Sequence, residues 1–246
     1  MSTDHPIPHG HAILLAAGQG RRFGATSGKG FTEIHGRPLL SWSLATFAAH
    51  PQIESIVVVV PPWSDGIERT RRDVIDPMGL GHRVVLAPGG DRRQDSSQLG
   101  IDALPASVRA NPSTIVLIHD AARPMVSGFL ITRCLRALAD FPDAAGVLPA
   151  LPVRETLKKA SDAWVERTVD RDGLWAAQTP QVFRLGPLRD AQARAQERGI
   201  AVTDDAALVE AAGGRLRIVP GDIENIKVTY PEDRILVERL LRVREG

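Results

Sequence analysis

Residues 14–31 read LLAAGQGRRFGATSGKGF, a basic, glycine-rich loop that directly follows an apolar run. The loop is not a Walker motif, because only three residues separate Gly24 from the Gly28-Lys29 pair and Gly30 replaces the hydroxyl residue that would bind magnesium. It also departs from the dinucleotide fingerprint, since Phe23 occupies the place of the third glycine. The loop therefore matches neither familiar class of phosphate-binding loop.

Two glycines and several cations remain as usable features of this loop. Gly18 and Gly20 let the backbone approach a ligand, while Arg21, Arg22 and Lys29 supply positive charge that could hold a triphosphate. A solvated glycine-rich turn with surface arginines is the alternative, because such loops are common. The positions of the other polar loops in the chain bear on this choice.

Composition indicates an aliphatic core and a surface of mixed charge. Hydrophobic residues make up 43% of the 246 residues and aromatic residues only 4%, as in folds with buried parallel strands. A net charge of +1 gives no reason to expect nucleic acid or a membrane as a partner. Cys134 is the sole cysteine, which excludes an internal disulfide and predicts a buried thiol in a reducing compartment.

The first residues and the hydropathy pattern favour a cytoplasmic protein. The stretch MSTDHPIPHGH at residues 1–11 lacks the apolar segment of a signal peptide and is expected to be a loose leader. No apolar run approaches the length of about 20 residues that a membrane-spanning helix needs. Neither a secretory signal nor a membrane anchor is therefore expected.

The first half of the chain alternates between short apolar runs and amphipathic segments of helical length. Strands are expected at residues 12–16, 56–60, 83–86 and 114–118, with helices at residues 38–49, 64–75, 95–104 and 127–139. This alternation predicts a single α/β domain with a mostly parallel sheet flanked by helices and joined by right-handed crossovers.

The rhythm changes after residue 146. Strand-like runs at residues 146–151, 153–158 and 164–169 are too close together for intervening helices. A hairpin or β-arm near residues 146–170 is therefore expected, which would project from the sheet or pair with a second subunit. Helices are expected at residues 185–198 and 204–212 and strands at residues 215–219 and 226–229. Pro231 should open a last helix, where its missing N–H costs little.

Two further polar loops follow predicted strands. Residues 88–96 read PGGDRRQDS and residues 119–124 read HDAARP. Because the carboxyl ends of parallel strands meet at one edge of an open sheet, both loops should lie beside residues 16–31. This common edge favours the ligand-binding interpretation of the first loop over the solvated turn.

Together these motifs resemble the 2-C-methyl-D-erythritol 4-phosphate cytidylyltransferases of the non-mevalonate isoprenoid pathway. The similarity spans nearly the whole chain and also covers less conspicuous segments: PVRETLK at residues 152–158, TPQ at 179–181, TD at 203–204 and NIKVT at 225–229. Several ordered motifs are more specific than any one of them. The resemblance implies a homodimeric, Rossmann-like nucleotidyltransferase in which an arm of one subunit reaches the active site of the other.

The resemblance also implies an activity and residue roles. The enzyme would join CTP to methylerythritol phosphate with Mg²⁺ and release pyrophosphate. Arg22 and Lys29 would stabilise charge on the α-phosphate, and Arg154 and Lys227 would place the acceptor phosphate. The remaining implied positions are nucleotide-binding at Ala16, Ala17, Gly18, Gly20, Gly90, Asp91, Arg93 and Ser96, and acceptor- or metal-binding at Asp120, Arg123, Thr179 and Thr203, with Asp120 as the metal ligand.

Three positions depart from the pattern usual in this family. Gly30 follows the loop lysine where Gln is usual, Ser97 stands where Val is common, and Glu155 replaces Asp. Gly30 could loosen the loop that carries Lys29, because glycine adds conformational freedom. None of the three removes a charge that the reaction needs.

The implied reaction explains the absence of a conventional nucleophile–base set. A phosphate monoester with a second pKa of about 6 is mostly dianionic at neutral pH, so its oxygen can attack the α-phosphorus without a general base. The difficulty is the repulsion between two polyanions, which fixed cations and a metal ion relieve. The seven scattered histidines show no metal-binding spacing, and His119 is expected to be structural.

Several candidate residues have plainer interpretations. Asp120 and Asp204 could cap helices, and Arg154 and Lys158 could belong to the solvated face of a strand. Trp164 and Trp175 are expected to pack the arm and its base.

Two other functions stay open at this point. A cytidylyltransferase for another sugar- or pentitol-phosphate would use the same fold, and a catalytically silent nucleotide-binding subunit would keep the same loops.

Overall fold

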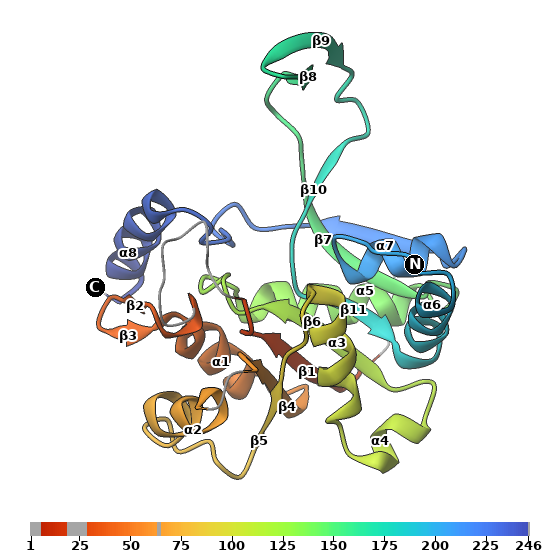
Figure 1. The fold of residues 1–246 in the computed structure, drawn as a ribbon. Coiled ribbons are helices and arrows are strands. Elements are labelled where there is room, and N and C mark those ends of the chain that lie inside the picture. The colour runs from red at the N-terminus through yellow and green to blue at the C-terminus, as the bar shows by residue number, and fades with distance from the viewer. Residues whose placement is uncertain (1–5, 19–28, 63–64, 246) are drawn as a thin grey trace.

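The computed structural model describes residues 6–18, 29–62 and 65–245 (Figure 1). It has the expected α/β architecture, a mostly parallel central sheet with helices on both faces (Figure 1).

The centre of the sheet consists of four parallel strands, β1 (Gly10–Leu15), β4 (Ile53–Val60), β5 (Val84–Pro88) and β6 (Ile115–Asp120). Their spatial order is β5-β4-β1-β6, so the chain moves outward from β1 in one direction and then returns to its other side. This reversal makes a topological switch point between β1 and β6, where ligands of open α/β sheets bind. Leu15 and Asp120 are register partners at the carboxyl ends of these two strands.

The other side of the sheet contains antiparallel strands that the sequence pattern did not reveal. β11 (Gln181–Arg184) lies between β6 and β7 (Gly146–Pro152) and is antiparallel to both, and β10 (Trp175–Ala177) pairs antiparallel with the far end of β7. β12 (Leu216–Pro220) pairs parallel with β7. The short β10 and β11 thus join the expected parallel strands into a mixed sheet.

Alternating side chains of the parallel strands fill two cores. On β1, Ala12 and Leu14 pack toward α1 and α5, whereas Ile13 packs toward α3, α6 and α7. Buried aliphatic side chains on both faces explain the continuous apolar runs of these strands. The helices are α1 (Leu39–Ala49), α2 (Gly66–Thr70) with the π-helical turn Arg71–Ile75, α3 (Arg93–Asp102), α4 (Ala106–Ala110), α5 (Gly128–Asp140), α6 (Leu185–Glu197) and α7 (Asp205–Ala211).

A third, smaller core anchors the C-terminal helix. α8 (Pro231–Glu245) begins at Pro231 as expected and buries Val237 and Leu241 against Ile34 of a short hairpin, β2 (Glu33–Ile34) with β3 (Arg37–Pro38), which follows the 3₁₀ turn Lys29–Phe31. Val228 is buried in the same core. The strand expected at residues 226–229 was wrong, because this segment is extended but pairs with no strand among the described residues.

The β-arm projects from the body of the molecule, beyond β7 and β10 (Figure 1). Its hairpin is β8 (Leu157–Ser161) with β9 (Trp164–Val169), so the strand expected at residues 153–158 was misplaced: residues 153–156 form no strand. Arg154 therefore lies on no strand face. The packing expected of the tryptophans was also wrong, since Trp164 is 82% and Trp175 45% exposed.

Within the described part of the chain, no helix is both long and apolar enough to span a membrane.

Candidate active site

The carboxyl end of β6 carries the densest group of charged contacts at the switch point. Asp120 accepts hydrogen bonds from Arg93 Nε at 3.1 Å and from Lys227 Nζ at 2.6 Å. Arg93 opens α3 after β5, and Lys227 comes from the extended segment before α8. Three separate parts of the chain therefore converge at the carboxyl ends of β1 and β6. Asp120 is not the helix cap that its sequence position also allowed.

The Asp120 carboxylate is held in its charged form. Burial by itself raises the pKa of this carboxyl, but the charges of Arg93 and Lys227 and the hydrogen bond from Lys227 outweigh burial and hold the pKa well below its usual range. The Lys227 side chain is 41% exposed, whereas that of Asp120 is only 11% exposed. The Lys227 side chain is thus the more accessible member of this pair.

Arg93 bridges Asp120 to a second, fully buried carboxylate. Its Nη1 donates to Asp205 Oδ2 at 2.6 Å, and Ser97 Oγ donates to Asp205 Oδ1, also at 2.6 Å. Burial lowers the pKa of Arg93, but the charges of Asp205 and Asp120 outweigh it, and the guanidinium stays charged. The third nitrogen, Arg93 Nη2, is buried without a partner among the described residues.

Sequence reasoning missed Asp205 and the role of Ser97. Asp205 directly follows Asp204, but the two acids have different contacts. Asp204 caps α7 by accepting a hydrogen bond from Ala207 N at 3.0 Å, which is the helix-capping role that the sequence also allowed for it. Burial raises the pKa of Asp205, against the opposing charge of Arg93. A second acid immediately after a helix cap was the only signal in the sequence, and it did not identify Arg93 as the partner.

Thr179 and His119 hold the backbone of Asp120 in place through hydrogen bonds. His119 Nε2 lies 3.2 Å from the Arg123 carbonyl, which can only accept, so Nε2 carries the hydrogen and Nδ1 accepts from Thr179 Oγ1 at 3.0 Å. Thr179 Oγ1 in turn accepts from Asp120 N at 3.0 Å. Burial lowers the pKa of His119 to about 4, so this neutral histidine is structural, as expected.

Arg123 holds in place the segment that carries Lys227. Its Nη1 donates to the Asn225 carbonyl at 2.7 Å and its Nη2 to the Ala177 carbonyl at 3.3 Å. Asn225 Nδ2 donates to the Thr179 carbonyl at 2.8 Å, and Val228 N donates to the Ala122 carbonyl at 2.8 Å. This contact set, which sequence reasoning did not foresee, fixes the position of residues 225–228.

Several of the predicted nucleotide-binding positions also gather at this edge. Ala16–Gly18 follow β1, and a Cβ placed on Gly89 would come within 2.3 Å of Ala17 Cβ and 3.0 Å of Ser96 Oγ. Ser96 Oγ accepts from Gly90 N at 3.1 Å. The loops that follow β1 and β5 are therefore packed against each other, as the common-edge argument predicted.

Other predicted residues lie elsewhere or outside the described residues. Gly20 and Arg22 lie outside the residues that the structure describes. Lys29 opens the 3₁₀ turn, but its side chain is not among the described parts of the structure. Asp91, Arg154 and Thr203 are exposed, and no contact described for this structure joins them to Asp120. The roles of these residues stay predictions.

The departure at position 30 has a visible consequence. Gly30 is buried, and a Cβ there would meet Ala16 Cβ at 3.5 Å, an ordinary packing distance. The structure therefore does not require glycine at this position.

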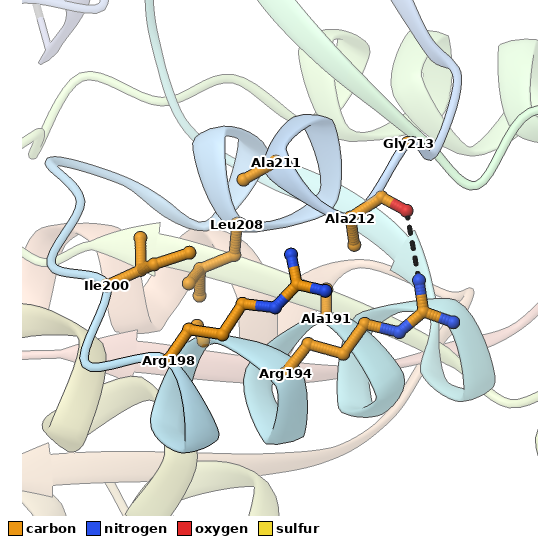
Figure 2. A pocket seen from close by; sticks show the side chains of 9 residues that line it. Ala191, Arg194, Arg198, Ile200, Leu208, Ala211, Ala212 and Gly213 are labelled. Carbon is orange, nitrogen blue, oxygen red and sulfur yellow. Dashed lines mark hydrogen bonds between the residues drawn. The ribbon is translucent and has the colours of Figure 1, made fainter.

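A separate cavity of about 280 Å³ lies between α6 and α7 (Figure 2). Ala191 and Leu208 line its apolar wall, and the guanidinium groups of Arg194 and Arg198 extend across it. Arg194 Nη1 donates to the Ala212 carbonyl at 3.2 Å at the end of α7. None of the predicted site residues lines this cavity.

Comparisons with known proteins show which family this chain belongs to. The family model described as 2-C-methyl-D-erythritol 4-phosphate cytidylyltransferase matches residues 11–243. A protein of that name from Thermosynechococcus vestitus is 42% identical over 235 residues, which cover 95% of this chain and 96% of that protein. The crystal structure of the protein of that name from Thermus thermophilus has a TM-score of 0.74 and 32% identity, covering 94% of this chain and 98% of that one.

Some relatives are longer than this chain. The protein named bifunctional enzyme IspD/IspF from Rhodospirillum rubrum is 43% identical over 233 residues, which are 94% of this chain but 56% of that protein. The chain thus corresponds to one part of such proteins and to nearly the full length of others. By its sequence and its fold, this chain belongs to the 2-C-methyl-D-erythritol 4-phosphate cytidylyltransferase family, nucleotidyltransferases of isoprenoid precursor biosynthesis.

Proposed function

We propose that this chain transfers the cytidylyl group of CTP to 2-C-methyl-D-erythritol 4-phosphate and that the transfer takes place beside Asp120 and Lys227. The location of the reaction is inferred from the Arg93–Asp120–Lys227 cluster, which lies at the switch point of the sheet. An oxygen of the acceptor phosphate attacks the α-phosphorus of CTP, the bond to the β-phosphate oxygen breaks, and pyrophosphate leaves.

The described residues suit this reaction because they supply positioned charge. The partly exposed Lys227 side chain can meet the acceptor phosphate while Asp120 holds its Nζ atom. Arg93 keeps a donor, Nη2, that no described residue uses. His119 is neutral and fully occupied by hydrogen bonds, so the proposed mechanism assigns it no proton transfer. Arg22 and Lys29 are proposed to stabilise the α-phosphate, on the strength of the family resemblance.

The charge and lone pairs of Asp120 fit a Mg²⁺ ion held mainly by phosphate oxygens. Mg²⁺ commonly binds through one or two carboxylates together with substrate phosphates. From the described residues each Asp120 oxygen accepts one hydrogen bond, which leaves a lone pair for such an ion. The described residues contain no group of three or more acidic, histidine or cysteine side chains that could hold a metal by themselves. When bound, Mg²⁺ would neutralise charge on the triphosphate.

We further propose that two chains associate through the β-arm and place Arg154 of one chain at the acceptor phosphate of the other. The arm carries exposed apolar side chains, Trp164 and Val165, which a partner would cover. Arg154 is exposed beside this arm. The buried, unpaired Cys134 is consistent with a cytoplasmic enzyme.

A pyrophosphate-release assay tests the proposed activity. Four nucleoside triphosphates would be crossed with methylerythritol phosphate, a pentitol phosphate and no acceptor, each with Mg²⁺ or with EDTA. We expect release only with CTP, methylerythritol phosphate and Mg²⁺ together. A preference for the pentitol phosphate would support the alternative cytidylyltransferase, and the absence of release in every arm would show a silent nucleotide-binding subunit.

A further inference from the structure

Asp205 is a buried carboxylate for which the proposed reaction has no direct use. It is 0% exposed at the first position of α7, and each of its oxygens accepts one short hydrogen bond, from Arg93 Nη1 and from Ser97 Oγ. Both donors lie on α3, one helical turn apart. Asp205 therefore holds the Arg93 guanidinium from the side opposite to Asp120.

The planar guanidinium transmits this constraint. Arg93 donates through Nη1 to Asp205 and through Nε to Asp120, so the two acids together fix the plane in which the guanidinium lies. Asp120 in turn receives the Lys227 ammonium on its other oxygen. The four charges thus form a chain of contacts, Asp205–Arg93–Asp120–Lys227, that begins in the interior and ends at an accessible cation.

We propose that Asp205 is a positioning residue for cytidylyl transfer, an inference that rests on the proposed function. Asp205 orients Arg93, and through Arg93 and Asp120 it places the Lys227 ammonium for the acceptor phosphate. Misplacement of a reacting group by about 1 Å can cost on the order of a hundredfold in rate. The hydrogen bonds between the charged groups of Asp205, Arg93, Asp120 and Lys227 oppose such misplacement.

A purely structural role would give a different result. A buried Arg–Asp pair between α3 and α7 could join two helices, and its loss would then lower the amount of folded enzyme without changing how the folded enzyme uses its substrates. A positioning role predicts a defect per folded molecule that depends on Lys227. A double-mutant cycle between Asp205 and Lys227 separates the two.

The experiment compares Asp205→Asn, Lys227→Ala and the double variant, each corrected for the folded fraction by circular dichroism. We expect Asp205→Asn to lower kcat about tenfold and to change the KM for CTP less than about twofold. The kcat of the double variant should equal that of Lys227→Ala within about twofold. Asp222→Asn is the matched control, because Asp222 also accepts from an arginine and a serine, Arg133 and Ser127, and it should keep wild-type kinetics.

Two results would overturn the inference. One is a wild-type kcat per folded molecule in Asp205→Asn. The other is a fold loss of kcat in the double variant that equals the product of the losses in the two single variants. If Asp205→Asn does not fold, Ser97→Ala replaces it in the cycle, because it removes only one hydrogen bond to Asp205 and should lower kcat severalfold with the same dependence on Lys227. A wild-type enzyme without cytidylyl transfer would refute the proposed function, an outcome distinct from both.

Discussion

The Nζ atom of Lys227 lies 2.6 Å from Asp120 Oδ2, although the two residues are 107 positions apart in the chain. The contact ties an accessible cation to the end of the central strand β6, and Arg93 completes it from a third part of the chain.

Replacing Lys227 by Ala should lower kcat/KM for the acceptor about a hundredfold, because one positioned cation at a transferring phosphate typically contributes that much. The loss should exceed any change in the KM for CTP, since the proposal assigns Lys227 to the acceptor. Arg215→Ala removes a cation from an exposed pair with Asp143 and should leave turnover unchanged. Steady-state kinetics with each substrate varied would check both variants, and an unaltered Lys227→Ala enzyme would contradict the proposed site.

Arg154 and Lys227 should complement each other between subunits. Arg154→Ala should mainly weaken use of the acceptor. If its guanidinium serves the partner's site, mixing and reassociating Arg154→Ala with Lys227→Ala should restore about a quarter of wild-type activity, because half of the dimers are hybrids with one intact site each. Sedimentation would verify the dimers. A mixture no more active than its parents would place Arg154 in the site of its own chain or outside any site.

Gly89→Ala should disturb the loop after β5. The new Cβ would overlap Ala17 Cβ and press on Ser96 Oγ and the Val60 carbonyl, and overpacking of this kind typically destabilises by about 1–3 kcal/mol. We also expect a raised KM for CTP, because Ala17 and Ser96 belong to the predicted nucleotide site. Gly81→Ala, which adds a Cβ in open space, is the control. Thermal unfolding and CTP kinetics equal to the wild type would show that the loop adapts freely.

Cys134 should be inert in the folded enzyme. Burial raises the pKa of its thiol to about 12, so almost no thiolate exists near neutral pH. A chromogenic disulfide reagent should give no signal from the native protein and about one thiol per chain after denaturation in guanidinium. Rapid modification under native conditions would mean that α5 opens readily.

His50 should make the protein less stable in mild acid. Burial lowers the pKa of His50 in the folded state, although the backbone of Gly128 opposes the shift. As the pH falls below about 6.5, the unfolded chain therefore binds more protons than the folded one, and the free energy of unfolding decreases. Urea denaturation at about pH 7.5 and about pH 5.5 should show a smaller loss for His50→Gln than for the wild type. Equal losses would show that His50 does not contribute, and His82→Gln, at an exposed position, is the control.

The alternation of strands and helices was predictable because each buried parallel strand needs an apolar run and each crossover helix needs an amphipathic one. The carboxyl-edge argument then placed the loops around Ala17, Ser96 and Asp120 together, and the structure confirms this placement. The segment at residues 226–229 shows where the pattern fails. Val228 points into a core and Lys227 toward Asp120, which gives strand-like alternation in a segment that pairs with no described strand.

The fold class and the polar loops could be read from the residues alone, because they depend on local periodicity and on residue types at strand ends, and the family resemblance added the chemistry. The position of β11 between β6 and β7, the two acids that contact Arg93, and the identity of Asp205 as one of them became apparent only in the folded chain. Strand order and ion-pair partners depend on contacts between residues far apart in the chain, and no local pattern records those contacts.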